Sequence, residues 1–154
     1  MKESRRNVAG LDTVVVEPDG PPGAEVVMLH GYAMTPEALA PFAHSLGARA
    51  RFWVPAGPLD GGDGTRAWWP VDVEARDREM SVGPRDLHDR RPAGSPEARR
   101  TLAAFLGAVR SRGGPAPPPR VVVGFSQGGM LACDTLLHEG LDVAALALLS
   151  ASRI

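Results

Sequence analysis

Cysteine and lysine are nearly absent from this 154-residue sequence. The single cysteine, Cys133, excludes a disulfide framework and a zinc site built from cysteines. Lysine occurs only as Lys2, so the sequence has no lysine for a phosphate-binding loop, a buried Schiff base or a Ser-x-x-Lys nucleophile. The net charge of −1 also excludes the basic surface that is typical of nucleic-acid-binding proteins, so no nucleic-acid partner is expected.

Long hydrophobic runs are missing as well. The longest apolar stretch, around residues 143–149, is far too short to span a bilayer, and residues 1–10 lack the apolar core of a signal peptide. We therefore expect a cytoplasmic protein with no integral membrane association. Hydrophobic residues make up 44% and charged residues 23%, which is typical of a globular protein. The length predicts one domain, residues 1–154, with a real core.

Apolar runs and helix-forming segments alternate along the chain. Because the strands lack polar alternation, they are typical of a sheet that is covered on both faces. The alternation predicts an α/β fold with a mainly parallel sheet and helices on both faces. Strands are predicted at 13–17, 25–29, 51–54, 121–123 and 144–149, and helices at 35–47 (kinked at Pro41), from Ser95 to Gly113-Gly114, and at 131–138 before Gly140.

Residues 58–95 contain many glycines and charges and no clear period. We predict a long irregular loop here, of a length that is usually functional or disordered.

Residues 121–130 contain the pattern Gly-x-Ser-x-Gly, as Gly124, Ser126 and Gly128, between a predicted strand and a predicted helix. A serine nucleophile at a sharp strand-to-helix turn needs such small neighbours, because side chains there would collide with the tight backbone. The helix that follows points free N–H groups toward the oxygen that becomes negative during acyl transfer. We interpret Ser126 as a nucleophile rather than as a spectator in a glycine-rich turn.

A dinucleotide-binding fingerprint is another interpretation of the same glycines. It requires a glycine at the position of Ser126 and an acidic residue about 20 positions later. Residues 146–150 include no acidic residue, so the sequence excludes it.

A second motif, His30-Gly31-Tyr32, ends the predicted strand at 25–29. An oxyanion hole takes one N–H from the residue after the nucleophile and one from a loop at this place. The candidate donors are the backbone N–H groups of Gln127 and Tyr32. We interpret His30 as a structural residue that braces this loop, the alternative being direct acid–base work.

Three segments together resemble the phospholipase/carboxylesterase family of small α/β-hydrolases, which includes bacterial carboxylesterases and acyl-protein thioesterases. They are Leu29-His30-Gly31, residues 66–72 (Arg-Ala-Trp-Trp-Pro-Val-Asp) and residues 124–130 (Gly-Phe-Ser-Gln-Gly-Gly-Met). The resemblance spans about residues 12–150. It implies an α/β-hydrolase fold and a carboxylesterase, lysophospholipase or thioesterase that acts on small acyl esters or thioesters through a serine acyl-enzyme, with no cofactor and no metal. It places the nucleophile on Ser126 and the oxyanion donors on Tyr32 and Gln127.

The tryptophan segment looks like the family's Ser-Trp-Phe-Asp region near the acyl pocket, with an inserted proline. Trp68 and Trp69 are therefore candidate substrate-binding residues, since ligand pockets are mostly apolar and aromatic. The alternative is a hydrophobic plug that holds the loop in place.

The acid and base of a catalytic triad are missing from this pattern. The family has them after the nucleophile, in the order Ser, Asp, His. His138 would lie about 18 Å along the helix from Ser126, whereas a base must come within about 3 Å. Asp142 precedes the last strand and should lie at the wrong end of the sheet. His44 and His88 are predicted to be surface residues.

We therefore expect an incomplete domain that lacks the C-terminal strands of the fold, as a fragment, a truncated gene product or one part of a complex. The leading hypothesis is a serine carboxylesterase, inactive or nearly so as this chain alone. The alternative is a non-catalytic α/β-hydrolase remnant that serves as a binding module. In either case, residues 144–149 have no charge or proline to block pairing, which predicts self-association through this last strand.

Overall fold

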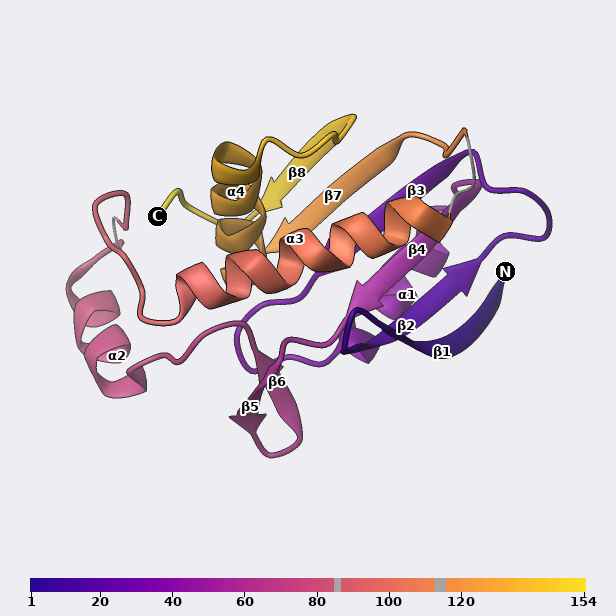
Figure 1. The fold of residues 1–154 in the computed structure, drawn as a ribbon. Helices are drawn as coiled ribbons and strands as arrows, with labels where there is room; N and C mark the ends of the chain where they lie inside the picture. Colours follow the sequence, from indigo (N-terminus) through magenta and orange to yellow (C-terminus); the bar gives the residue numbers. More distant parts are fainter. Residues whose placement is uncertain (85–86, 113–115) are drawn as a thin grey trace.

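The computed structural model describes residues 1–84, 87–112 and 116–154. Its main feature is a six-stranded sheet with the order β1-β2-β4-β3-β7-β8 (Figure 1). β2 runs antiparallel to β1 and to β4, whereas β4, β3, β7 and β8 are parallel to one another. The predicted mainly parallel sheet is thus confirmed. Its strands are β1 (Lys2–Val8), β2 (Leu11–Glu17), β3 (Ala24–Leu29), β4 (Ala50–Pro55), β7 (Arg120–Phe125) and β8 (Ala145–Leu149).

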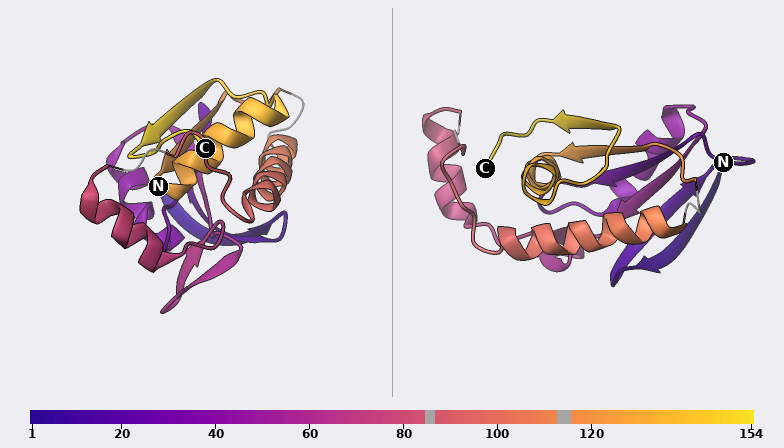
Figure 2. Two further views of the ribbon diagram at one scale, coloured as in Figure 1. Left: turned by 90° about the vertical axis from the view of Figure 1, so that its left-hand side faces the viewer. Right: turned by 45° about the horizontal axis from the view of Figure 1, so that its top comes forward.

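Helices cover both faces of the sheet, as predicted. On one face lie α3 (Ser95–Arg112) and α4 (Gln127–Glu139), and on the other lie the 3₁₀ helix η1 (Pro36–Ala38) and α1 (Ala40–Ser45) (Figure 1 and Figure 2). Each central strand supplies both cores, because successive side chains of a strand point to opposite faces.

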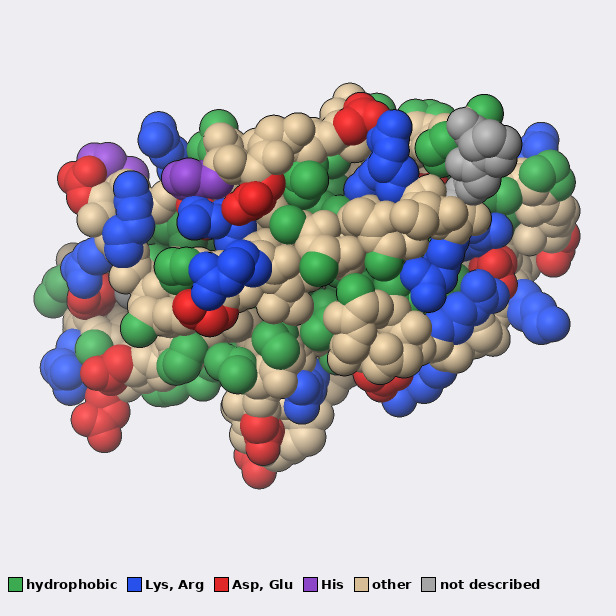
Figure 3. All heavy atoms as spheres, in the orientation of Figure 1, with side chains coloured by type: hydrophobic (Ala, Val, Ile, Leu, Met, Phe, Trp, Pro, Cys, Tyr) green, Lys and Arg blue, Asp and Glu red, His purple; other side chains and the backbone are tan. Residues whose placement is uncertain are grey.

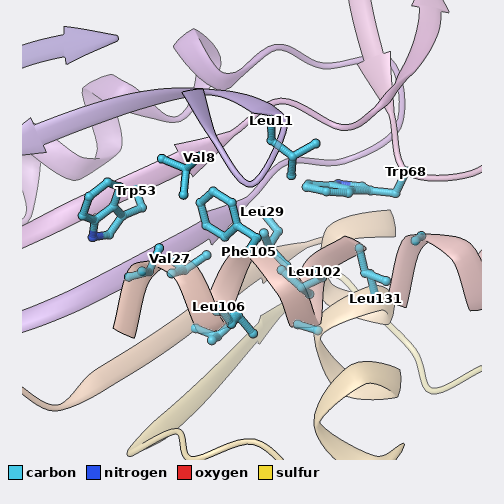
Figure 4. Packing of buried hydrophobic residues seen from close by; sticks show 14 of the residues in the cluster. Val8, Leu11, Val27, Leu29, Trp53, Trp68, Leu102, Phe105, Leu106 and Leu131 are labelled. Carbon is cyan, nitrogen blue, oxygen red and sulfur yellow. The ribbon is translucent and has the colours of Figure 1, made fainter. Parts of the chain in front are cut away.

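The core under α3 is the larger of the two. Val27 and Leu29 of β3 pack there against Leu102 and Phe105 of α3, and all four are fully buried (Figure 4). The intervening residue Met28 contributes to the other core, under α1. This division explains why β3 is apolar at nearly every position.

The first predicted helix, residues 35–47, is broken into two. Thr35 precedes η1, and a new helix, α1, begins after Leu39 with Pro41 in its first turn. Proline is tolerated in the first turn, where its missing N–H has no partner to lose, but not within a helix. Pro41 therefore starts a helix instead of kinking one.

The prediction of an irregular loop at 58–95 was wrong for part of that region. It contains a hairpin of β5 (Leu59–Gly62) and β6 (Thr65–Ala67), followed by α2 (Val73–Val82). α2 has no buried residue, so its sequence carries no apolar period. β1 was missed for a similar reason, since only Val8 at its end is buried. The predicted stop of α3 at Gly113-Gly114 lies outside the described residues.

None of the helices in the described ranges combines the length and the apolar character needed to cross a membrane.

The two edges of the sheet differ in how they are protected. β1 carries four charged residues, while β8 is apolar, with Leu146, Leu148 and Leu149 37% to 42% exposed. Natural sheet edges use charges to prevent pairing with other chains. The edge at β8 lacks this protection.

We predict that the 154-residue chain self-associates through β8. Leu148→Lys should lower the apparent mass toward that of the monomer, because a charge at the edge opposes strand pairing. Light scattering over a range of protein concentrations measures this. Leu137→Lys is the matched control, since Leu137 is an exposed leucine on α4. A monodisperse parent chain at every concentration would contradict the prediction.

Candidate active site

Ser126 occupies the sharp turn between β7 and α4. Its backbone has φ 50° and ψ −117°, a conformation that residues with a side chain rarely adopt. The turn is held on both sides: the Ser126 N–H donates to the Leu149 carbonyl at 2.9 Å, and the Met130 N–H donates to the Ser126 carbonyl at 3.0 Å. The strained serine is thus tied to β8 and to the first turn of α4.

The two glycines of the motif lie where no side chain fits. A Cβ atom on Gly124 would come within 2.5 Å of the Gly129 Cα, and one on Gly128 within 2.5 Å of the carbonyl oxygens of Leu29 and His30. α4 therefore begins directly against the end of β3. This close approach brings the loop after β3 next to Ser126.

His30, in that loop, is fully buried. Its Nε2 accepts a hydrogen bond from the Gly57 N–H at 2.8 Å. Nδ1 therefore carries the proton of the neutral ring and donates it to the Gly31 carbonyl at 2.7 Å. Both ring nitrogens bind backbone, so His30 connects its loop to the end of β4. Gly31 is also tightly packed, since a Cβ atom there would lie 3.0 Å from the Phe125 ring.

Burial lowers the pKa of His30 below its ordinary value of 6.5 and outweighs the hydrogen bond to Gly31, which acts in the other direction. The folded chain then resists a proton that the unfolded chain accepts. We predict that the neutral, buried His30 ring contributes to the free energy of unfolding. This contribution is complete above about pH 6.5 and is lost as the pH falls below it.

Urea unfolding at pH 7.5 and pH 5.5 measures this effect. Equal stability of the parent chain at both pH values would refute the role given to His30.

The two tryptophans have different environments. Trp68 is 1% exposed, stacks on the His30 ring with 5.3 Å between centroids, and donates from Nε1 to the His30 carbonyl at 2.9 Å. It acts as the buried plug that was one of its two interpretations, and it does not line the cavity described below. Trp69 does line that cavity.

Gln127 holds both tryptophans through its side chain. Its Oε1 accepts from the Trp68 N–H and its Nε2 donates to the Trp69 carbonyl, each at 2.9 Å. The sequence interpretation used only the backbone N–H of Gln127. No local pattern indicates the side-chain role, because the partners are distant in sequence and meet only through the fold.

Ser126 opens onto a cavity of about 340 Å³. Tyr32, Trp69, Gln127 and Met130 line it near the serine, and α2, Leu87 and residues 90–92 form its other wall. The Gln127 N–H belongs to the first turn of α4, whose N–H groups have no partner within the helix. The predicted nucleophile and both predicted oxyanion donors thus share one cavity.

A known protein family matches the sequence of this chain. A family model described as the alpha/beta hydrolase family matches residues 26–153. This chain belongs to the α/β-hydrolase family. The match confirms the resemblance inferred from the sequence motifs.

Three solved structures share the fold of this α/β-hydrolase. A carboxylesterase from Mesorhizobium loti is 18% identical, with a TM-score of 0.74 over 99% of this chain and 66% of its own. Esterase PE8 is 28% identical, with a TM-score of 0.72 over 100% of this chain and 66% of its own. Zea mays acyl-protein thioesterase 2 is 23% identical, with a TM-score of 0.66 over 92% and 62%. The chain thus spans about two thirds or less of their lengths. No curated protein sequence matches it.

A histidine base is absent from the described part of this cavity. None of the four histidines, all of which the structure describes, lines it. His30 is engaged with backbone, His44 approaches Glu3, and His138 bonds back to its own helix. His88 is exposed beside Asp89, as expected for a surface residue. Among the described residues, the Ser126 hydroxyl group has no hydrogen-bond partner.

Proposed function

We propose that this chain carries the nucleophile of a serine hydrolase, which cleaves small carboxylic esters or thioesters through an acyl-enzyme. The observation that supports this best is Ser126 itself. It is held in a strained turn at the mouth of a cavity that it shares with Tyr32 and Gln127. Such strain in a residue with a side chain is typical of functional sites.

In the proposed reaction, the Ser126 Oγ attacks the carbonyl carbon and its proton passes to a base. The N–H groups of Tyr32 and Gln127 stabilise the negative oxygen of the tetrahedral intermediate. The intermediate collapses, the alcohol or thiol leaves with the proton, and the acyl group stays on Ser126. Water then attacks the acyl-enzyme by the same route and releases the acid.

The base in this proposal is an imidazole from outside these 154 residues, since the four histidines are committed elsewhere or lie away from the cavity. The acyl group would lie against Trp69, Met130 and Leu87, whose side chains give the cavity its apolar part. A volume of about 340 Å³ suits a short acyl chain. The similar solved structures include esterases and a thioesterase, which supports this class.

A second function is favoured by the lack of a histidine near Ser126. The chain would then be a binding module that keeps the turn and the cavity without catalysis. The two proposals differ in whether Ser126 becomes a nucleophile when a base is supplied.

A fluorophosphonate probe with added imidazole distinguishes them. We expect slow labelling of the 154-residue chain, because no base activates the hydroxyl group, and clear acceleration by imidazole at neutral pH. Peptide mapping should place the phosphonate on Ser126, with fluoride as the leaving group. Ser126→Ala should abolish labelling. Ser150→Ala should not, although Ser150 is exposed and has the same φ of 50°. Failure of imidazole to accelerate labelling at Ser126 would favour the binding module.

A further inference from the structure

The wall of the cavity opposite Ser126 is charged. It contains Arg76 and Glu79 of α2, Asp72 at the start of that helix, and Arg90 and Arg91. Figure 3 shows basic and acidic side chains together at the end of the molecule where α2 lies. The balance among these groups decides which substrates the wall attracts.

Both carboxylates of the wall are already engaged. The Asp72 Oδ1 accepts from the Ala75 N–H at 2.8 Å and so caps α2. The Glu79 Oε1 lies 3.1 Å from Nη2 of Arg90. Neither carboxylate is paired with Arg91, so the acidic groups leave its charge unbalanced.

Arg91 has no carboxylate partner among the described residues. A hydrogen bond runs from its Nη1 to the Arg90 carbonyl at 3.2 Å. A guanidinium group has five N–H donors in a planar fork and stays charged at any ordinary pH. Most of the donors of Arg91 are therefore left for a ligand.

Arg76 adds a second positive charge on the side of the proposed oxyanion hole. Its guanidinium carbon lies 5.7 Å from the centre of the Tyr32 ring. Within the described residues its ion-pair partner is Asp77, at 2.9 Å, whose side chain is 60% exposed and does not line the cavity. An exposed pair of this kind contributes little interaction energy, so Asp77 holds Arg76 only weakly and a ligand in the cavity can compete for it.

We propose that this cavity selects esters that carry an anionic group, a carboxylate or a phosphate, and that Arg91 binds that group directly. The inference rests on the proposed function, because it names the substrate class of the same site. Arg76 assists through its charge, and the apolar side near Trp69 receives the rest of the molecule. A cavity of about 340 Å³ accommodates a small ester of this kind.

Binding to the Ser126→Ala chain tests this without any need for hydrolysis. The probes are monomethyl glutarate, which is anionic, and dimethyl glutarate, which differs only by a second methyl ester. By titration calorimetry we expect the anionic ester to bind about fivefold more tightly, as for one solvent-accessible ion pair of about 1 kcal/mol. A butyryl ester of glycerol 3-phosphate, in a parallel titration, determines whether phosphate replaces the carboxylate.

Variants at Arg91 make the test specific. Arg91→Gln should bring the two glutarate esters to equal affinity, whereas Arg91→Lys should keep a preference for the anion. The control is Arg100→Gln on α3, where Arg100 pairs with Glu97 and does not line the cavity. Equal binding of the two esters to the parent, or an unchanged preference in Arg91→Gln, would overturn the inference. Neither result affects labelling of Ser126, which tests the proposed function separately.

Discussion

Ser126→Ala is expected to lower ester hydrolysis about 10⁶-fold in a chain extended to supply the acid and base, and to change the 154-residue chain very little. The residues of a triad act as a unit, so removal of one costs about as much as removal of all. Without a base, the hydroxyl group of Ser126 already contributes little. The residual rate, about 10³–10⁴ above water in a serine protease, comes from the oxyanion hole and from binding.

Hydrolysis of a p-nitrophenyl ester by four proteins measures this: each chain length, with and without Ser126→Ala. Ser150→Ala in both lengths controls for the loss of a serine hydroxyl group in a backbone of similar φ. An extended chain that remains active without Ser126 would show that another residue is the nucleophile. A large loss in the short chain would show that a base exists among these 154 residues.

The second large effect is expected at Gly128. Gly128→Ala places a Cβ atom within 2.5 Å of the carbonyl oxygens of Leu29 and His30. The Leu29 oxygen belongs to the end of β3 and the His30 oxygen to the loop after it, so neither can yield unless the backbone moves. We expect a loss of about 3 kcal/mol in the free energy of unfolding, at the upper end for overpacking. That corresponds to a decrease of about 10 °C in the melting temperature for a chain of this size.

Thermal unfolding followed by circular dichroism measures the decrease. Gly107 provides a control of opposite sign, because it is exposed on α3 and a Cβ atom there meets nothing within 4 Å. Gly107→Ala should stabilise the helix by about 0.5–1 kcal/mol. If Gly128→Ala melts at the temperature of the parent, then α4 does not begin as close to β3 as the structure places it.

The parts of the fold that the sequence predicted are those with an apolar signal. β3 is buried on both faces, and β7 is buried on one face and partly buried on the other, so their apolar runs were sufficient. The turn at Ser126 was predicted because the tight backbone there leaves no room for side chains, so the neighbouring residues must be glycines. By contrast, β1 and α2 present mainly charged residues to water and bury almost nothing, which leaves no period to detect.

The sequence predicted part of the candidate site because several of its residues directly follow apolar strands. Ser126, Tyr32 and Gln127 follow strands, and the strand ends of a parallel sheet meet at one edge. The different environments of Trp68 and Trp69 depend instead on His30 and on the side chain of Gln127. These contacts join residues far apart in the chain, so no local pattern contains them.

The two bonds from the Gln127 amide to the tryptophan segment also bear on how the site can change over evolution. In the proposed reaction, the residue whose N–H would bind the oxyanion also anchors Trp69, so reshaping that side of the cavity would displace the proposed donor. α2 is under no such constraint, because none of its residues is buried. New substrate preferences should therefore arise through replacements on α2 and in residues 90–92, while the side at Trp69 stays constant.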